Sequence, residues 1–298
     1  MKKNLLLIIT LKSLLISQST FPGLNSWTQS NTIGLSGGGY LISYQNEFRN
    51  AAMLVEANRF FQLNLIKYPA DINAQSIIVN GAYKEHYLGI SIRHINYGIF
   101  ESRTNENIIT GNFSASDTHM QMGYAKYLYK NKLIIGINSG LFLSSIENSN
   151  ATAITISPSL LLKANKFTAA LTLENYGKLI DSYGNSNEPM HGSIIFSISR
   201  SLKNYPIQIE LDQISYNGLN YKSYHLSALY TTKNKINLKG GISSNRDDRI
   251  NSNQLSKDIL NDIGVGIGYE FDNLILDFNT YSYSNNNFIY GISIASRF

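Results

Sequence analysis

The 298-residue sequence contains no cysteine, and charged residues make up only 15% of it. Soluble domains carry about 25% charged residues, so this composition is not typical of them. Without cysteine, a disulfide framework and a lipid anchor attached to cysteine are both excluded. The formal net charge is +5, but three of these charges lie in the first twenty residues, and 5 − 3 leaves +2 for the rest. This small excess gives no electrostatic reason to expect a nucleic-acid partner.

Long apolar runs are also missing after the first twenty residues, although 43% of the sequence is hydrophobic. The start itself resembles a secretory signal peptide, because a basic MKK precedes a mostly apolar stretch from Leu5 to Ile16 and small residues follow as far as Ser19. A transmembrane anchor is the alternative. It is disfavoured because the stretch is shorter than the ~20 residues of a spanning helix and Lys12 interrupts it. We therefore expect residues 1–19 to be removed, residues 20–298 to form one domain, and any membrane insertion to use strands.

Alternation of apolar and polar residues is the main periodic signal in the rest of the chain. It recurs in windows of about ten residues, the length of a tilted spanning strand. The windows are Phe60–Lys67, Ser76–Tyr83, Tyr87–Asn96, His119–Tyr129, Leu133–Ser144, Ala151–Leu162, Lys166–Glu174, Ser193–Arg200, Ile207–Asp212, Tyr224–Thr231, Ile236–Ser243, Gly264–Asp272, Leu274–Tyr281 and Phe288–Phe298. Short polar breaks, typical of hairpin turns, separate most of them.

The polar face of these windows distinguishes two all-β folds. A soluble β-sandwich would have to bury one face of every strand. Here the alternate positions carry Lys, Glu, Asp, Asn and Gly in strand after strand, which favours a wet interior behind a lipid-facing band. At about 20 residues for a strand and its turn, the chain has room for about 14 strands. The sequence therefore predicts an all-β fold, an antiparallel transmembrane β-barrel.

The last window gives the most specific evidence for an outer-membrane barrel. One face carries Phe288 and the residues Tyr290, Ile292, Ile294 and Phe298. A final strand that alternates in this way and ends on an aromatic residue resembles the signature by which outer-membrane barrels are recognised for insertion. We therefore interpret Tyr290, Ile292, Ile294 and Phe298 as a barrel assembly signal, and we expect the protein to lie in the outer membrane of a bacterium, in contact with its lipid.

Two stretches resemble a known family. The first comprises HINYGIFE from His94 and GNFSASD from Gly111, and the second comprises LENYGKL from Leu173 followed by Glu188-Pro189. In their order and spacing both resemble blocks of the PorV/PorQ family of outer-membrane barrels, with PorQ the closer match. The residues that carry the resemblance are His94, Asn96, Tyr97, Gly98, Phe113, Ser114, Ala115, Ser116, Asp117 and Gly177. Where family members often carry Asn-Pro-Ala after a Gly-rich strand, this chain has Gly37–Gly39 and then Asn50-Ala51-Ala52.

The resemblance implies a FadL-like barrel and a non-enzymatic role in the type IX protein secretion system. Family members anchor a surface attachment complex, so the implied partners are other secretion-system subunits, including a sortase-like surface peptidase. The alternative function is a FadL-like outer-membrane transporter of hydrophobic small molecules. A transporter of that kind would need an apolar lumen pocket, whereas the predicted interior faces are polar and rich in glycine. The sequence therefore favours the secretion role.

Motifs for catalysis and for cofactors are weak. Gly37–Gly39 lacks the Lys-Ser/Thr of a phosphate-binding loop, so we expect close backbone packing at a strand kink instead. His94 has no second His or Cys at ligand spacing, so we expect a structural or lumen-facing histidine and no metal. Its neighbour Arg93 should point to the opposite face. No Ser/His/Asp arrangement stands out, and we expect neither an enzyme nor a cofactor.

Carboxylates on the interior faces are candidates for a lumen cluster, and two long polar segments are candidates for loops. The carboxylates are Glu210, Asp212, Glu270, Asp272 and Asp277. We interpret them as ordinary lumen charges rather than as catalytic acids. The two segments, Ser243–Asp262 and Tyr176–Gly192, are expected outside the cell, since the long loops of such barrels lie there. Solvated loops and partner docking are equally favoured for the first of them.

Overall fold

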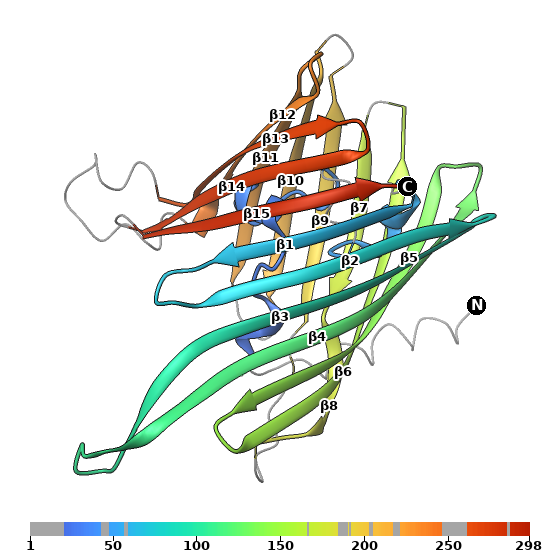
Figure 1. The fold of residues 1–298 in the computed structure, drawn as a ribbon. Helices are drawn as coiled ribbons and strands as arrows, with labels where there is room; N and C mark the ends of the chain where they lie inside the picture. The colour runs from blue at the N-terminus through green and yellow to red at the C-terminus, as the bar shows by residue number, and fades with distance from the viewer. Residues whose placement is uncertain are drawn as a thin grey trace, which may run out of the picture.

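Antiparallel strands form one continuous sheet that closes on itself as a barrel (Figure 1). The computed structural model describes residues 21–42, 48–56, 59–165, 167–183, 190, 192–202, 205–216, 221–245, 261–284 and 287–298. The strands are β1 (Phe60–Lys67), β2 (Asn73–Tyr83), β3 (His86–Arg103), β4 (Ile109–Tyr129), β5 (Leu133–Ile146), β6 (Ser149–Lys163), β7 (Thr168–Glu174), β8 (Tyr176–Asp181), β9 (Ser193–Ser201), β10 (Ile207–Tyr216), β11 (Lys222–Thr231), β12 (Ile236–Ser243), β13 (Ile263–Phe271), β14 (Leu274–Ser284) and β15 (Asn287–Arg297). Strand β15 pairs with β1 and closes the barrel.

β7 and β8 are two halves of one spanning strand. Both pair with β6: Thr172 lies opposite Ser159, and Tyr176 lies opposite Ile156. Asn175, between the two halves, has a φ of 56°, and the register shifts by one residue there, as in a β-bulge. With this pair counted once, the fifteen segments make a closed barrel of fourteen strands. The predicted antiparallel barrel of about 14 strands is therefore confirmed.

The alternating windows of the sequence coincide with the strands. Burial alternates along most of them, as in β9, where every second residue from Ser193 to Ser199 is buried. The outward positions carry large apolar side chains that are exposed, which is the composition expected of a lipid-facing band. Among the described residues, no helix has the length and apolarity to cross a bilayer.

The two ends of the barrel differ in their connections. We call the end at which Phe60 and Phe298 lie the turn end, because its connections are short, such as Lys84–Glu85 and Asp272–Asn273. The opposite end, the loop end, carries the two longest connections, residues 182–192 and 244–262. In bacterial barrels the short turns are periplasmic and the longer loops extracellular. The predicted loop Tyr176–Gly192 begins late, because Tyr176–Asp181 is strand β8. Most of the predicted loop Ser243–Asp262 lies outside the described residues.

The N-terminal segment lies inside the barrel and forms a plug, which we define as residues 21–42 and 48–56. It contains the short helices η2 (Pro22–Leu24), α2 (Ser30–Gly34) and η3 (Ala51–Val55), drawn in blue within the barrel in Figure 1. Near the turn end its apolar residues pack against wall residues that point inward. This cluster comprises Leu41, Phe48, Ala52, Met53, Leu54 and Val55 of the plug and Ile78, Ala125, Ile134, Leu161 and Ala170 of the wall. Each large side chain buried in this way contributes about 1.5–3 kcal/mol.

Two sequence expectations about this segment change. Gly37–Gly39 packs closely, as expected, but it lies in the plug after α2 and not at a strand kink. The stretch without proline, Asn50–Ala52, starts η3, where the Asn50 side chain accepts a hydrogen bond of 3.2 Å from the Ala52 amide. The Asn50 side chain thus caps the start of η3 without a proline at the first helical position. The predicted signal peptide, residues 1–19, lies outside the described residues.

The closing strand has the predicted faces. Tyr290, Ile292, Ile294 and Phe298 all point outward, with exposed fractions between 45% and 67%. The Phe298 amide donates to the Arg59 carbonyl at 3.2 Å, immediately before β1 begins. The C-terminal residue therefore forms the last bond of the seam between the first and the last strand.

We expect deletion of Phe298 to reduce barrel insertion, because the seam loses its last hydrogen bond and the closing strand loses its aromatic end. The measurement is the amount of heat-modifiable protein in the outer membrane, with Phe298→Tyr as a control that keeps an aromatic terminus. Equal amounts of the deletion variant and the unchanged protein would contradict the assignment of an assembly signal.

A plugged lumen with a polar cavity

Two carboxylates of β10 hold the backbone of the plug. Glu210 accepts hydrogen bonds from the Leu41 amide at 2.8 and 3.0 Å, and Asp212 accepts one from the Gly39 amide at 2.9 Å. Both carboxylates are buried, with exposed fractions of 1% and 0%. A buried backbone amide that lacks an acceptor is costly, so these bonds fix the plug against β10. Glu210 and Asp212 thus point into the lumen, as predicted, and they bind the plug.

Hydroxyl, imidazole and amide groups of the wall satisfy other polar atoms of the plug. Ser227 donates to the Leu35 carbonyl at 3.1 Å, and His225 Nδ1 lies 2.7 Å from the Ser36 carbonyl. Asn64 accepts from the Ser30 amide at 3.0 Å. An irregular segment inside a barrel needs such partners, because its backbone groups are removed from water. The polar faces that the sequence suggested to be wet are therefore mostly occupied by the plug.

Glycines allow the plug to approach the wall closely. A Cβ on Gly241 would lie 2.3 Å from the Leu35 carbonyl oxygen, and a Cβ on Gly136 would lie 2.2 Å from the Ala52 nitrogen. Any side chain at either position would therefore displace the plug backbone. This explains why glycine occupies the inward positions 136 of β5 and 241 of β12.

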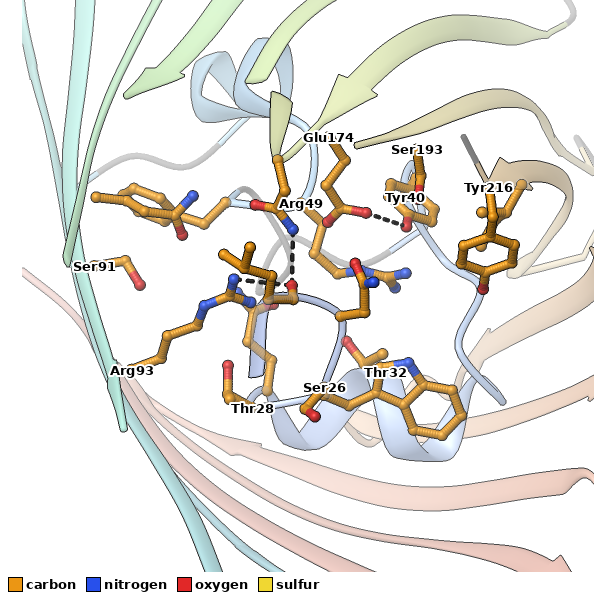
Figure 2. A pocket seen from close by; sticks show the side chains of 18 residues that line it. Ser26, Thr28, Thr32, Tyr40, Arg49, Ser91, Arg93, Glu174, Ser193 and Tyr216 are labelled. Atoms are coloured by element: carbon orange, nitrogen blue, oxygen red, sulfur yellow. Dashed lines mark hydrogen bonds between the residues drawn. The ribbon is translucent and has the colours of Figure 1, made fainter. Parts of the chain in front are cut away.

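A polar cavity of about 60 Å³ remains between the plug and the wall (Figure 2). Figure 2 labels residues of the lining, which come from both the plug and the wall: Ser26, Thr28, Thr32, Tyr40, Arg49, Ser91, Arg93, Glu174, Ser193 and Tyr216. Asn25, which also lines the cavity, is exposed, whereas Thr28 and Gln29 are buried. The cavity is therefore accessible on the side of Asn25, and the plug closes it on the side of Thr28 and Gln29.

Arg49 brings one positive charge to the cavity. Its guanidinium donates to the carbonyls of Gly37 and Gly38 at 2.6 and 2.8 Å, and it stacks over the Tyr40 ring at 3.8 Å. Burial raises the pKa of Tyr40 well above its usual range, so the phenol stays protonated and donates to Glu174 at 3.0 Å. Burial acts to lower the pKa of Arg49, but the Tyr40 side chain and the carboxylates of Glu174 and Asp212 raise it above its usual value, and the guanidinium stays charged.

Arg93 of β3 brings a second positive charge. Its Nη2 donates to the Leu24 carbonyl at 3.1 Å, and its Nε donates to His119 Nδ1 at 3.1 Å. His119 is itself buried, and its Nε2 lies 2.7 Å from the Thr155 hydroxyl. Arg93 therefore connects the wall, a buried histidine and the first turn of the plug.

The family-like segments meet at this first turn of the plug. Asp117 accepts from the Gly23 amide at 3.0 Å and from the Tyr97 hydroxyl at 2.7 Å. From the second segment, Asn175 donates to the Leu24 carbonyl at 2.7 Å. Although the sequence separates the two segments widely, both bind the turn formed by Pro22–Leu24.

The other residues of the first segment form the long hairpin of β3 and β4. Asn96 lies opposite Ser116, and Phe100 lies opposite Phe113, with their rings stacked at 5.4 Å. The register shifts between Asn96 and Ile99, where Gly98 adopts a φ of 94°. Ser114 and Ala115 lie in β4 beside this bulge. In the second segment, Gly177 lies opposite Thr155, and a Cβ there would meet the Ile154 carbonyl at 2.1 Å.

His94 is not lumen-facing, which corrects part of the sequence interpretation. It lies on the face of β3 that carries the exposed Ile90 and Ile92, and its Nδ1 lies 2.8 Å from the Thr118 hydroxyl. Arg93 points into the lumen, on the opposite face as predicted. In the sequence, His94 continues the alternation of Leu88, Ile90 and Ile92, which already places it on their outward face.

The remaining carboxylates do not gather into one cluster. Asp277 is buried and pairs with Lys239, which also donates to Asn31 of the plug. Glu270 pairs with Arg297 at 2.6 Å, and Asp272 lies in the turn between β13 and β14, with a φ of 49°. In the described parts of the chain, no three His, Cys, Asp or Glu side chains are placed to hold a metal.

The sequence did not identify the residues that form the cavity. Trp27, Tyr40 and Arg49 lie in a segment without helical or strand periodicity, so no pattern predicted their place inside the barrel. For Arg93, the sequence predicted only that its side chain points to the face opposite His94. The one signal available was the fact that Trp27 is the single tryptophan of the chain and lies outside every alternating window.

Solved structures of other proteins have a similar architecture. No family model matches the chain, and no curated protein matches its sequence. Among solved structures, the CymD monoaromatic hydrocarbon channel superposes with a TM-score of 0.64 at 12% identity, over 91% of this chain and 97% of that one. The toluene transporter TodX of P. putida gives 0.56 at 10% identity, over 92% and 99%. A FadL homologue of Pseudomonas aeruginosa gives 0.55 at 9% identity, over 95% and 99%. The chain has the FadL-type barrel fold.

At these identities the likeness concerns the fold of the FadL-type barrel and not the side chains of its lumen. It supports the predicted outer-membrane location, because the similar structures are barrels of that kind. The PorV/PorQ resemblance stays a prediction, since it rests on the two quoted segments alone.

We expect Gly241→Ala to loosen the plug of this FadL-type barrel, because the new Cβ would overlap the Leu35 carbonyl. Overpacking of this kind costs about 1–3 kcal/mol. The measurement is the rate at which trypsin cleaves at Arg49 inside the folded barrel. Gly240→Ala is the matched control, since a Cβ on Gly240 would meet no atom within 4 Å. Equal cleavage rates in the two variants would show that the close approach of the plug is unimportant.

We expect the double substitution Glu210→Ala, Asp212→Ala to open the lumen to ions, because the buried amides of Leu41 and Gly39 lose their acceptors. Each unsatisfied group costs about 1–3 kcal/mol. Conductance in planar bilayers is the measurement, and Glu270→Ala, which removes a carboxylate that pairs with Arg297 and not with the plug, is the control. A double variant as closed as the control would refute the holding role of β10.

Proposed function

We propose that this protein is a plugged outer-membrane channel for small hydrophobic molecules. The observation that carries the proposal is the barrel itself: fourteen strands around a plug formed by the N-terminal segment, with the fold of three proteins of which two are described as a hydrocarbon channel and a toluene transporter. The barrel spans nearly the whole of each of those chains, so the likeness includes no large extra domain.

The filled lumen determines how such a channel would work. A cavity of about 60 Å³ is much smaller than the ~150 Å³ cavity that accommodates benzene, so a hydrocarbon cannot pass while the plug keeps this position. Passage therefore requires the plug to shift from the wall. The polar bonds to β10 and β11 are the contacts that must break, because they join the two parts directly.

A disulfide lock, which joins the plug to the wall, tests the proposal. Because the chain has no cysteine, the two introduced residues have no native thiol with which to pair. A Cβ on Gly34 would lie 3.3 Å from the Cβ of Asn279, close to the ~3.8 Å of a disulfide. We expect cells that make the Gly34→Cys, Asn279→Cys variant to take up radiolabelled toluene several-fold more slowly than cells with the unchanged protein, and reduction to restore the rate. Gram-negative cells with an intact outer membrane are required, since a plain phospholipid bilayer does not hold back toluene.

The two single-cysteine variants are the controls, because neither can form the lock. Uptake that is no faster with the unchanged protein than in cells lacking it would refute the channel. Uptake that is fast and indifferent to the lock would refute a moving plug.

A role in type IX secretion is the second candidate, and two observations favour it. The two segments that resemble the PorV/PorQ family bind the same turn of the plug. In addition, the hairpin of the first segment extends β3 and β4 beyond β2, with Ile99 and Ile109 exposed at 77% and 54%. Such a hairpin could hold a partner outside the cell. Recovery of a sortase-like peptidase with gently extracted protein would support this candidate over transport.

A further inference from the structure

The connections at the two ends of the barrel carry opposite charge. At the turn end, where Figure 1 marks the C-terminus, the described connections expose five lysines and two carboxylates: Lys84, Lys130, Lys132, Lys233, Lys235, Glu85 and Asp272. At the loop end, the exposed charged residues of the described connections are Asp71, Glu106 and Glu147, and these parts of the chain contain no lysine or arginine. The small net charge of the chain therefore conceals a positive turn end.

The lysines of the turns lie beside exposed tyrosines. The Nζ atom of Lys84 is 5.3 Å from the centre of the Tyr83 ring, and that of Lys130 is 5.2 Å from the centre of the Tyr129 ring. Tyr83 and Tyr129 are exposed at 68% and 56%. Exposed tyrosines mark the level of the lipid headgroups in membrane barrels. The lysines of the turn end therefore lie at the level of the headgroups.

A groove of about 440 Å³ adjoins one of these lysines. It is lined by Lys132, Leu162, Lys163, Ala164, Asn165 and Phe167, from the turns that join β4 to β5 and β6 to β7. The Lys163 amide donates to the Lys132 carbonyl at 2.7 Å, so the two side chains start from adjacent backbones. Lys163 pairs with Glu56 of the plug, whereas none of the ion pairs between described residues includes Lys132. Lys132 is thus the cation that the groove offers to a ligand.

The groove also has an apolar side. Leu162 and Phe167 are exposed at 46% and 45%, and Leu162 continues the outward face of β6 that carries Leu160. A cation beside exposed apolar side chains suits a molecule that has both an anionic head and a hydrocarbon chain. A soluble polyanion would leave the apolar side uncovered. Phospholipids have this chemistry, and the short turns of bacterial barrels face the periplasmic, phospholipid leaflet.

We propose that the turn end binds an anionic phospholipid in this groove, with the phosphate at Lys132 and an acyl chain along Leu162 and Phe167. Basic residues next to a membrane attract anionic lipids, and basic pockets at the ends of spanning segments bind the headgroup of cardiolipin. The lysines of the neighbouring turns extend the attraction over the whole turn end. This site goes beyond the channel proposed above and does not depend on it, because it lies on the outside of the wall.

Competition between two lipids tests the site. The purified, delipidated full-length barrel in a neutral detergent receives equal amounts of cardiolipin and phosphatidylcholine with the same acyl chains, and native mass spectrometry measures which lipid is retained. Phosphatidylcholine is the matched probe, since it has a phosphate but no net charge. We expect cardiolipin to be preferred at least about fivefold. The preference should largely disappear in about 1 M salt, where the Debye length falls to about 3 Å.

Substitutions assign the lipid to the groove. We expect the double substitution Lys130→Gln, Lys132→Gln to lower cardiolipin retention at least about fivefold. The matched control is Lys178→Gln, Lys222→Gln, which removes two exposed lysines of β8 and β11 near the loop end and should leave retention unchanged. Phe167→Ala keeps the charge and removes an apolar contact, so it should also weaken retention. Heat modifiability shows that each variant is folded.

Three outcomes would overturn the proposal. Equal retention of the two lipids, or full retention of cardiolipin by the Lys130→Gln, Lys132→Gln variant, would remove the anionic lipid. Full retention by Phe167→Ala would remove the acyl chain from the groove. Sedimentation of the barrel with isolated peptidoglycan sacculi that requires Lys130 and Lys132, without a preference between the lipids, would assign the positive turn end to the cell wall instead. None of these results changes the toluene uptake expected of the channel.

Discussion

The plug has little regular secondary structure, and its backbone N–H and C=O groups need partners inside a closed wall. Strands pair their own backbones, so the wall has only side chains to offer. Glu210, Asp212 and His225 supply acceptors and donors at the places where the plug passes β10 and β11. The polar character of the lumen, the inward Gly241 of β12 and the position of the cavity all follow from this requirement, because each accommodates or bonds the same segment.

Much of the barrel could be predicted from the sequence. Period-two alternation is a direct consequence of a wall with one face in lipid and one in the lumen, so every window coincided with a strand, and the terminal faces of β15 were correct. The bulge at Asn175 could not be predicted. A single inserted residue preserves the alternation on both sides of it, and Asn175 resembles a turn residue in the sequence.

The plug and its cavity lay beyond sequence reasoning for a different physical reason. Residues such as Tyr40 and Arg49 are placed by long-range bonds to Glu174, Gly37 and Gly38, and no local periodicity encodes these contacts. The inward carboxylates of β10 could be predicted, because they alternate with apolar residues in the sequence. Their partners were not, because a segment outside every strand offers no register from which a contact can be derived. Only the lumen-facing alternative for His94 was wrong, because the residue shares the outward face of Ile90 and Ile92.

A polar lumen, as predicted from the sequence, disfavours transport of hydrophobic molecules. In the structure, however, the lumen contains both a polar cavity and an apolar cluster. The polar cavity is accessible past Asn25, and Phe48, which also lines it, belongs to the apolar cluster near the turn end. A molecule that enters from the loop end therefore meets charged and polar groups before it meets apolar ones. A lumen that is polar at one level and apolar at the next is thus compatible with transport, provided that the plug moves.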